Sequence, residues 1–168
     1  MPTLQIDGLT FSFPAGWQIS KYDDWAFYRS RFAKMWDGIK AVDLLAVSGD
    51  QVAWFIEVKD YRQHPRTNPS NLATDVAHKV FHTLAAMLPA KVGAADDEER
   101  RFAQMVGRAN RLRVILHLEQ PLKHSKMFPR AIDPADVNQR MRQMLKPVDA
   151  HPVVVEMSRM RDLAWSVR

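Results

Sequence analysis

The spacing of hydrophobic residues changes along the first 35 positions, and it predicts a hairpin followed by a helix. Two short runs, Thr3–Ile6 and Leu9–Phe13, flank Asp7-Gly8. That dipeptide favours the positive backbone angles of a hairpin turn. Ser20, with a carboxylate three residues later, has the pattern of a helix N-cap, and a helical apolar spacing continues to about Met35.

Residues 41–47 and 51–61 are strongly hydrophobic, and they predict two adjacent strands. The sequences AVDLLAV and QVAWFIEVKDY are separated by a short polar turn that begins Ser48-Gly49-Asp50. Both stretches are apolar at odd and at even positions. Such strands are typical of a sheet interior that is covered on both sides. We therefore expect these two strands in the middle of a sheet with helices on each face.

The second half alternates between helical and strand-like periods. Helices are predicted at residues 72–88, 96–109 and 133–146, and strands at 111–119, 152–157 and 163–167. Pro89 is expected to end the first of these helices, because proline lacks the amide that a helix interior needs. The predicted fold class is α/β, with a central mixed β-sheet flanked by helices on both faces.

Size and composition are those of one globular domain. The chain has 168 residues, of which 46% are hydrophobic and 26% are charged. No apolar run approaches the roughly 18 residues of a membrane span. The first residues lack the pattern of a secretory signal, and there are no cysteines. We expect one domain over residues 1–168, located in the cytoplasm.

The charge is unevenly distributed. The net charge is +5, and residues 1–84 contain as many acidic as basic side chains. The whole basic excess therefore lies in residues 85–168. This excess predicts an acidic partner, for which nucleic acid is the leading candidate.

Charged residues interrupt both central strands. Asp43 lies in the first, and Glu57 and Lys59 lie in the second. Because burying an unpaired carboxylate is costly, such groups are usually paired, bound to metal or placed where a strand opens to water. Strand alternation places Glu57 and Lys59 on one face. Two carboxylates suit Mg²⁺, and a nearby lysine can orient water or stabilise a phosphate. The alternative is an ion pair at a strand end.

The turn between the two strands tests whether Asp43 can join Glu57. A two-residue turn at Gly49-Asp50 would place position 43 opposite position 56, and Asp43 would then point away from Glu57. A shared site requires an odd loop, Gly49–Gln51, or a bulge near the strand ends. We predict the odd loop or the bulge.

The pair formed by Asp43 and Glu57-Val58-Lys59 resembles the signature of the PD-(D/E)xK nuclease superfamily, also called restriction-endonuclease-like. That signature is an Asp on one strand and Glu-x-Lys on the next. The resemblance covers roughly residues 20–120. It implies a divalent ion, Mg²⁺ or Mn²⁺, held by Asp43, Glu57 and the main-chain carbonyl of Val58, and a catalytic role for Lys59 toward the attacking water. The implied activity is metal-dependent cleavage of DNA.

The sequence departs from that family in two places. The family usually has a strand between its first helix and the Asp strand, but only residues 36–40 are available here. That strand is therefore expected to be absent or supplied by the N-terminal hairpin. Many members also carry a Glu on the first helix, for which Asp23 or Asp24 is the nearest substitute.

Other residues are candidates for contact with nucleic acid: Tyr61 by stacking, and Arg62, Lys79, Lys123 and Lys126 through phosphates. For each the alternative is a structural or solvated side chain. The sequence has no Gly-rich phosphate loop, GxSxG motif or cysteine, which argues against P-loop hydrolysis and covalent acyl transfer.

So short a chain has little room for reading base sequence, so a homodimer or a partner protein is expected to supply specificity. The alternative function is a non-catalytic module of the same fold that binds nucleic acid or protein.

Overall fold

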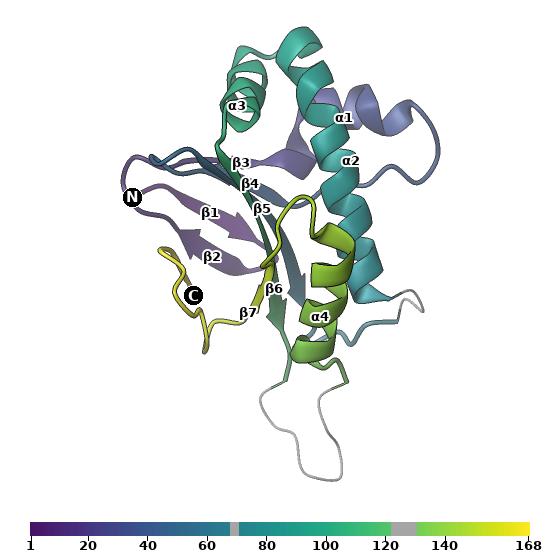
Figure 1. Ribbon diagram of the computed structural model, residues 1–168, viewed down its shortest axis with the longest axis vertical. Coiled ribbons are helices and arrows are strands. Elements are labelled where there is room, and N and C mark those ends of the chain that lie inside the picture. Colours follow the sequence, from purple (N-terminus) through teal and green to yellow (C-terminus); the bar gives the residue numbers. More distant parts are fainter. Residues whose placement is uncertain (68–70, 122–130) are drawn as a thin grey trace.

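A five-stranded mixed sheet forms the centre of the protein. The computed structural model describes residues 1–67, 71–121 and 131–168 (Figure 1). The strand order is β3-β4-β5-β6-β7. Strand β4 is antiparallel to both of its neighbours, β3 and β5, and β5, β6 and β7 run parallel. Their bounds are β3 Gln18–Lys21, β4 Leu44–Val47, β5 Val52–Asp60, β6 Arg111–Glu119 and β7 Val153–Val155. The predicted α/β class with a mixed sheet is confirmed.

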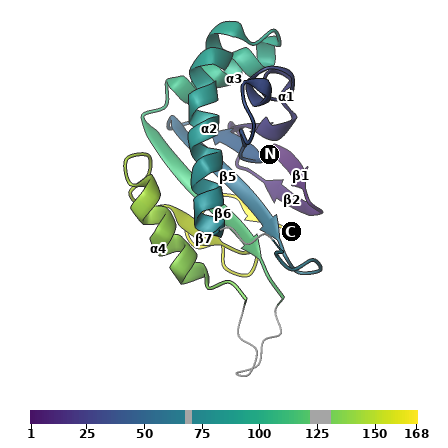
Figure 2. The same ribbon diagram turned by 90° about the vertical axis from the view of Figure 1, so that its right-hand side faces the viewer.

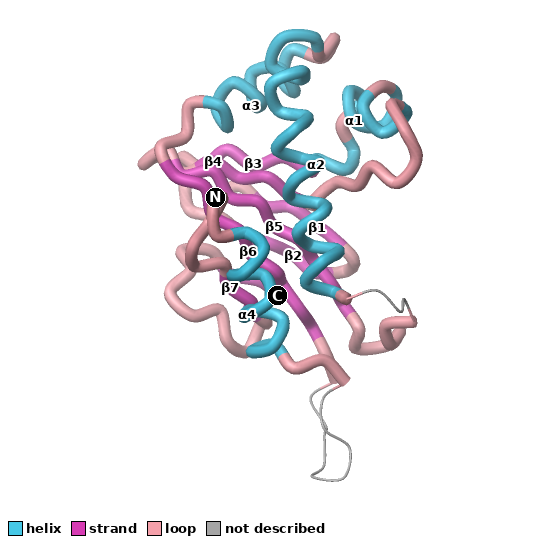
Figure 3. Tube along the Cα trace, turned by 45° about the vertical axis from the view of Figure 1, so that its right-hand side comes forward, coloured by secondary structure: helices cyan, strands magenta, loops and turns pink. Residues whose placement is uncertain are grey.

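The α-helices of the described residues pack on one face of this sheet. They are α1 Ala26–Ser30, α2 Leu72–Gly93, α3 Asp97–Gly107 and α4 Pro134–Leu145. Each contributes to a hydrophobic core that also contains Phe55, Val114 and Leu116 from the sheet. Figure 3 shows α2 and α4 crossing the same side of the strands.

The other face is covered by a second, three-stranded sheet. Its strands are β1 Thr3–Ile6, β2 Leu9–Ser12 and β8 Ser166–Val167, in the order β1-β2-β8. Phe11 and Phe13 pack with Ile56, Val58 and Ile115 of the central sheet. Figure 2 shows this small sheet and α4 on opposite sides of the central strands.

The expectation of helices on both faces is therefore wrong. The apolar pattern of the central strands requires a cover on each face, but a second sheet satisfies that requirement as well as a helix does. The N-terminal hairpin itself is confirmed, and Asp7 and Gly8 have the predicted positive φ angles of 50° and 81°.

The predicted helix over residues 20–35 is also wrong. Residues 18–21 form β3, and α1 is a single short helix between two 3-10 turns. The Ser20 hydroxyl accepts a hydrogen bond from the Trp25 indole at 2.7 Å and caps no helix. Because β3 pairs with β4, the strand expected next to the Asp strand is present, but it precedes α1 and is separate from the N-terminal hairpin.

Helix α2 continues past Pro89 to Gly93, where the sequence predicted an end. A proline in a helix removes the hydrogen bond to the carbonyl four residues earlier, which here belongs to Ala85. Ala85 and Pro89 are both exposed, so water can bond that carbonyl.

None of the helices in residues 1–67, 71–121 and 131–168 has the length and hydrophobicity to cross a bilayer.

Glu99 of α3 caps the short helix α1, and its removal tests how much this long-range cap contributes. Its carboxylate accepts hydrogen bonds from the Ala26 and Phe27 amides at 2.7 and 3.1 Å. We expect Glu99→Ala to lower the free energy of unfolding by about 1–2 kcal/mol, because both amides lose an acceptor. Urea denaturation measures the change. The exposed neighbour Glu98 is the control, and an equal loss in Glu98→Ala would contradict the assignment.

Candidate active site

The β4–β5 connection places Asp43 and Glu57 on the same face of the sheet. Leu44 is opposite Ile56, and the strands are joined by the three-residue loop Gly49–Gln51. Gln51 has a φ of 61°, as the last residue of such a loop requires. The odd loop is confirmed. Asp43 directly precedes β4, so it lies across from Glu57 on the side of the sheet that carries the helices.

Backbone contacts hold Asp43 at the end of β5. Its Oδ2 accepts a hydrogen bond from the Val58 amide at 2.7 Å, and its own carbonyl accepts one from the Tyr22 amide at 3.0 Å. In an antiparallel ladder the amide and carbonyl of one residue point toward the same neighbouring strand. The Val58 carbonyl therefore points to the side on which Asp43 lies.

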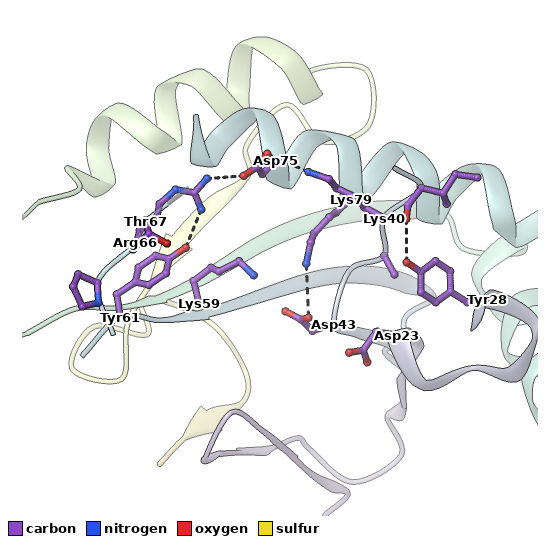
Figure 4. Close-up of a pocket in the computed structure, with 13 residues that line it drawn as sticks. Asp23, Tyr28, Lys40, Asp43, Lys59, Tyr61, Arg66, Thr67, Asp75 and Lys79 are labelled. Carbon is purple, nitrogen blue, oxygen red and sulfur yellow. Dashed lines mark hydrogen bonds and ion pairs between the residues drawn. The ribbon is translucent and has the colours of Figure 1, made fainter. Parts of the chain in front are cut away.

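Glu57 is the buried charge of the site, with 1% of its surface exposed. Its Oε1 lies 2.6 Å from the ammonium nitrogens of both Lys59 and Lys79. Its Oε2 is buried and has no hydrogen-bond partner among the residues that the structure describes. The Lys79 nitrogen also lies 3.9 Å from Asp43 Oδ1 (Figure 4), so this lysine faces both carboxylates.

Burial and the neighbouring Asp43 carboxylate raise the pKa of Glu57 to about 7, although both lysines act in the opposite direction. For Lys59, burial alone would lower the pKa, but the Glu57 carboxylate outweighs it and raises the pKa above its ordinary value. Such opposed effects are typical of functional sites.

Thr83 joins α2 to the segment that carries Asp43. Its fully buried hydroxyl accepts a hydrogen bond from the Val42 amide at 3.1 Å and donates one to the Lys79 carbonyl at 2.7 Å. The preceding residue, His82, accepts a hydrogen bond from the Lys40 amide at its ring nitrogen Nδ1. The helix that supplies Lys79 is thereby fixed to the chain that supplies Asp43.

An open cleft of about 590 Å³ lies beside the two carboxylates. Its lining includes Asp43, Lys59 and Lys79, and an ion-paired wall formed around Asp75. Asp75 pairs with Arg66 at 2.5 Å and with Lys40 at 3.3 Å, and Arg66 also donates to the Tyr61 hydroxyl (Figure 4). Asp23, considered from sequence as a substitute carboxylate, lines the same cleft.

The predicted site residues differ in where the structure places them. Asp43, Glu57, Val58 and Lys59 come together, and Tyr61 lines the cleft. Arg62 does not line it, because its guanidinium binds the Asp60 carboxylate next to it. Lys123 and Lys126 lie outside the described residues. Lys79, expected to contact phosphate, lies within the carboxylate cluster itself.

Two contributions were missed by the sequence reasoning. The buried face of α2 includes Val76, Thr83 and Ala86, which lie at helical spacing from Lys79. That spacing is a signal that Lys79 points toward the sheet. No local pattern marks Lys40, which reaches Asp75 from a separate segment.

The donor set fits one divalent cation that keeps part of its water shell. Glu57 Oε2 lacks a partner, Asp43 is its neighbour, and the Val58 carbonyl lies on the same side. In the described part of the chain, no three His, Cys, Asp or Glu side chains form a group able to hold a metal. Mg²⁺ often binds through one or two carboxylates, water and substrate phosphate, so two carboxylates are sufficient.

Comparison with known proteins gives one similarity. The chain matches no protein-family model and no solved structure. It is 26% identical over 208 residues to a cysteine–tRNA ligase of Neisseria meningitidis serogroup A. The match covers 99% of this chain and 30% of the ligase, so the chain spans less than a third of that protein's length.

The pKa of Glu57 predicts a specific dependence of stability on pH. The carboxyl ionises near 4.5 when unfolded and near 7 when folded, so the folded state binds more protons between those values. The contribution of Glu57 to the free energy of unfolding should therefore fall by about 3 kcal/mol as pH rises from 4.5 to 7. Urea denaturation in EDTA measures it, with Glu57→Gln as reference. If the free energies of unfolding of the wild type and Glu57→Gln differ by the same amount at pH 4.5 and at pH 7, the prediction is contradicted.

The Thr83 hydroxyl predicts a stability loss that depends on one oxygen. Thr83→Val keeps the side-chain volume but leaves the buried Val42 amide without its acceptor, at an expected loss of about 1–3 kcal/mol. Thr83→Ser retains the hydroxyl and should lose less. Thermal and urea unfolding of the two variants measure the difference, and equal losses would show that the methyl group, and not the hydrogen bond, is responsible.

Proposed function

We propose that this protein is a metal-dependent phosphodiesterase that cleaves nucleic acid, with DNA as the expected substrate. The observation that supports this proposal best is the convergence of Asp43, Glu57 and Lys59 on one face of the sheet, beside an open cleft, with Glu57 Oε2 unpartnered. The same residues carry the resemblance to PD-(D/E)xK nucleases. The cysteine-free composition favours the cytoplasm as its compartment.

Asp43, Glu57 and the Val58 carbonyl would hold Mg²⁺ or Mn²⁺. When bound, such an ion lowers the pKa of a water molecule and neutralises charge on a phosphate. The Lys59 side chain is 26% exposed and lines the cleft, and its ammonium group is oriented by Glu57 at 2.6 Å. It can hold the attacking water or donate to a phosphate oxygen. Tyr61 presents an aromatic ring to the same cleft, suitable for stacking on a base or sugar.

The similarity to a cysteine–tRNA ligase makes RNA the first alternative substrate to test. Because the ligase is named for its action on tRNA, a tRNA transcript belongs beside duplex and single-stranded DNA in any assay. The net charge of +5 is compatible with each of these polyanions. A homodimer or a partner protein would add specificity.

A non-catalytic nucleic-acid-binding module is the second candidate, and the position of Lys79 favours it. An ammonium between two carboxylates balances part of their charge without a metal ion. A site stabilised in this way would keep its structure and bind phosphates without cleaving them. That function requires binding that weakens with salt, unaffected by Mg²⁺ or by substitution of Glu57.

A cleavage assay separates the two candidates. Plasmid DNA, labelled oligonucleotides and tRNA are incubated with Mg²⁺ or Mn²⁺, and product is followed on gels. We expect Asp43→Asn, Glu57→Gln and Lys59→Met each to reduce cleavage at least about 100-fold, as for loss of a group that stabilises the transition state, and EDTA to abolish it. Glu98→Gln, the same change at an exposed position of α3, should leave cleavage unchanged.

Cleavage that persists in Glu57→Gln would contradict the proposal. Salt-sensitive binding in the absence of any metal-dependent product would favour the binding module instead.

A further inference from the structure

Lys79 occupies the space between the two carboxylates that a divalent cation would bind. We propose that Lys79 is a positioning residue that competes with the metal: its ammonium holds Asp43 and Glu57 together in the metal-free protein, and cation binding displaces it into the cleft. This inference rests on the proposed function, because it assigns a regulatory role within the same site.

The contacts of Lys79 differ from those of Lys59. The Lys79 nitrogen lies 2.6 Å from Glu57 Oε1 and 3.9 Å from Asp43 Oδ1, so it faces both carboxylates. Lys59 has a 2.6 Å ion pair with Glu57, and it belongs to the same strand as its partner. A cation that binds both carboxylates would therefore compete with Lys79 for each of them, but with Lys59 for Glu57 alone.

The oxygens open to a cation also point to competition with Lys79. Asp43 Oδ2 already accepts the Val58 amide, and Glu57 Oε1 already faces two ammonium groups. Glu57 Oε2, which is buried without a partner, and Asp43 Oδ1 remain. Since Lys79 lies next to Asp43 Oδ1, a cation bridging these two oxygens would be within a few ångströms of its ammonium group.

Charge makes coexistence unfavourable. When both are ionised, Asp43 and Glu57 together carry two negative charges, and Lys59 and Lys79 already balance them. A divalent ion would leave a local excess of two positive charges in a site where Glu57 is almost fully buried. Like charges at such short separation repel strongly where water is scarce. Departure of one ammonium group removes half of that excess.

A displaced Lys79 ammonium group can be accommodated in the cleft, next to Asp75. Asp75 lies one helical turn before it on α2, at the spacing that favours an acidic residue followed by lysine. Both residues line the same cleft. A displaced ammonium would approach Asp75 at the cleft wall, where a substrate phosphate would also be within its reach.

Direct measurement of Mn²⁺ binding tests the competition without any cleavage assay. Isothermal titration with Mn²⁺ alone compares the wild type, Lys79→Met, Lys40→Met and Glu57→Gln. We expect Lys79→Met to bind Mn²⁺ at least about 10-fold more tightly, because the competing charge is removed. Lys40→Met is the matched control: it removes a cleft lysine that pairs with Asp75 and should change affinity less than about threefold.

Lys79→Met leaves two carboxylates without one of their counter-ions and can lose stability. The rise in melting temperature on adding Mn²⁺ is therefore measured as well. A competitor that has been removed should make this rise larger in Lys79→Met than in the wild type, because ligand stabilisation follows affinity. Lys79→Arg, which keeps the charge, should resemble the wild type in both measurements.

The outcomes separate this inference from the proposed function. Equal or weaker Mn²⁺ binding in Lys79→Met, with binding lost in Glu57→Gln, would overturn the competition and leave the metal site standing. Absence of Mn²⁺ binding in all four proteins would overturn both. Tighter Mn²⁺ binding in Lys79→Met, together with loss of binding in Glu57→Gln, supports both the competition and the metal site.

Discussion

The register between β4 and β5 is the constraint on which the rest of the site depends. A three-residue loop, completed by Gln51 at positive φ, pairs Leu44 with Ile56 and so brings Asp43 across from Glu57. A register shift of one residue would reverse the faces of every side chain on one strand. The apolar side chains resist that shift, because Leu45 and Phe55 belong to the helix-side core while Leu44 and Ile56 pack under the small sheet.

The same register buries a carboxylate whose ionic partners come from its own strand and from a distant helix. It leaves Glu57 with almost no exposure to water, and a buried carboxylate needs partners. Lys59 supplies one from the same strand. Helix α2 supplies the other through Lys79, and Thr83 fixes that turn of the helix to the Val42 amide. The position of α2 is thus tied to the charges as well as to the hydrophobic core.

The sequence predicted the features that follow from local periodicity. The two central strands, the odd loop and the convergence of Asp43 with Glu57 depend on alternation and on turn length, both of which are visible in a single chain. The cap of α1 by Glu99 and the pairing of Asp75 with Lys40 were not predictable in this way, because their partners lie far apart in sequence. The four-residue repeat of Leu72, Val76, Val80, Leu84 and Leu88 does not stay on the buried face along the whole of α2. Steps of four residues drift around a helix of 3.6 residues per turn, and Leu88 ends 67% exposed.

Lys79 was predicted to contact phosphate, but it lies on the sheet side of α2 and pairs with Glu57. Steps of three and four combined follow the sheet side of α2 through Val76, Thr83 and Ala90, and Lys79 lies on this line. A cation at that position can be tolerated only because the strand below presents carboxylates instead of apolar side chains. The lysine on the helix and the carboxylates on the strands are therefore parts of one arrangement: neither would be stable in its present position with an apolar partner opposite.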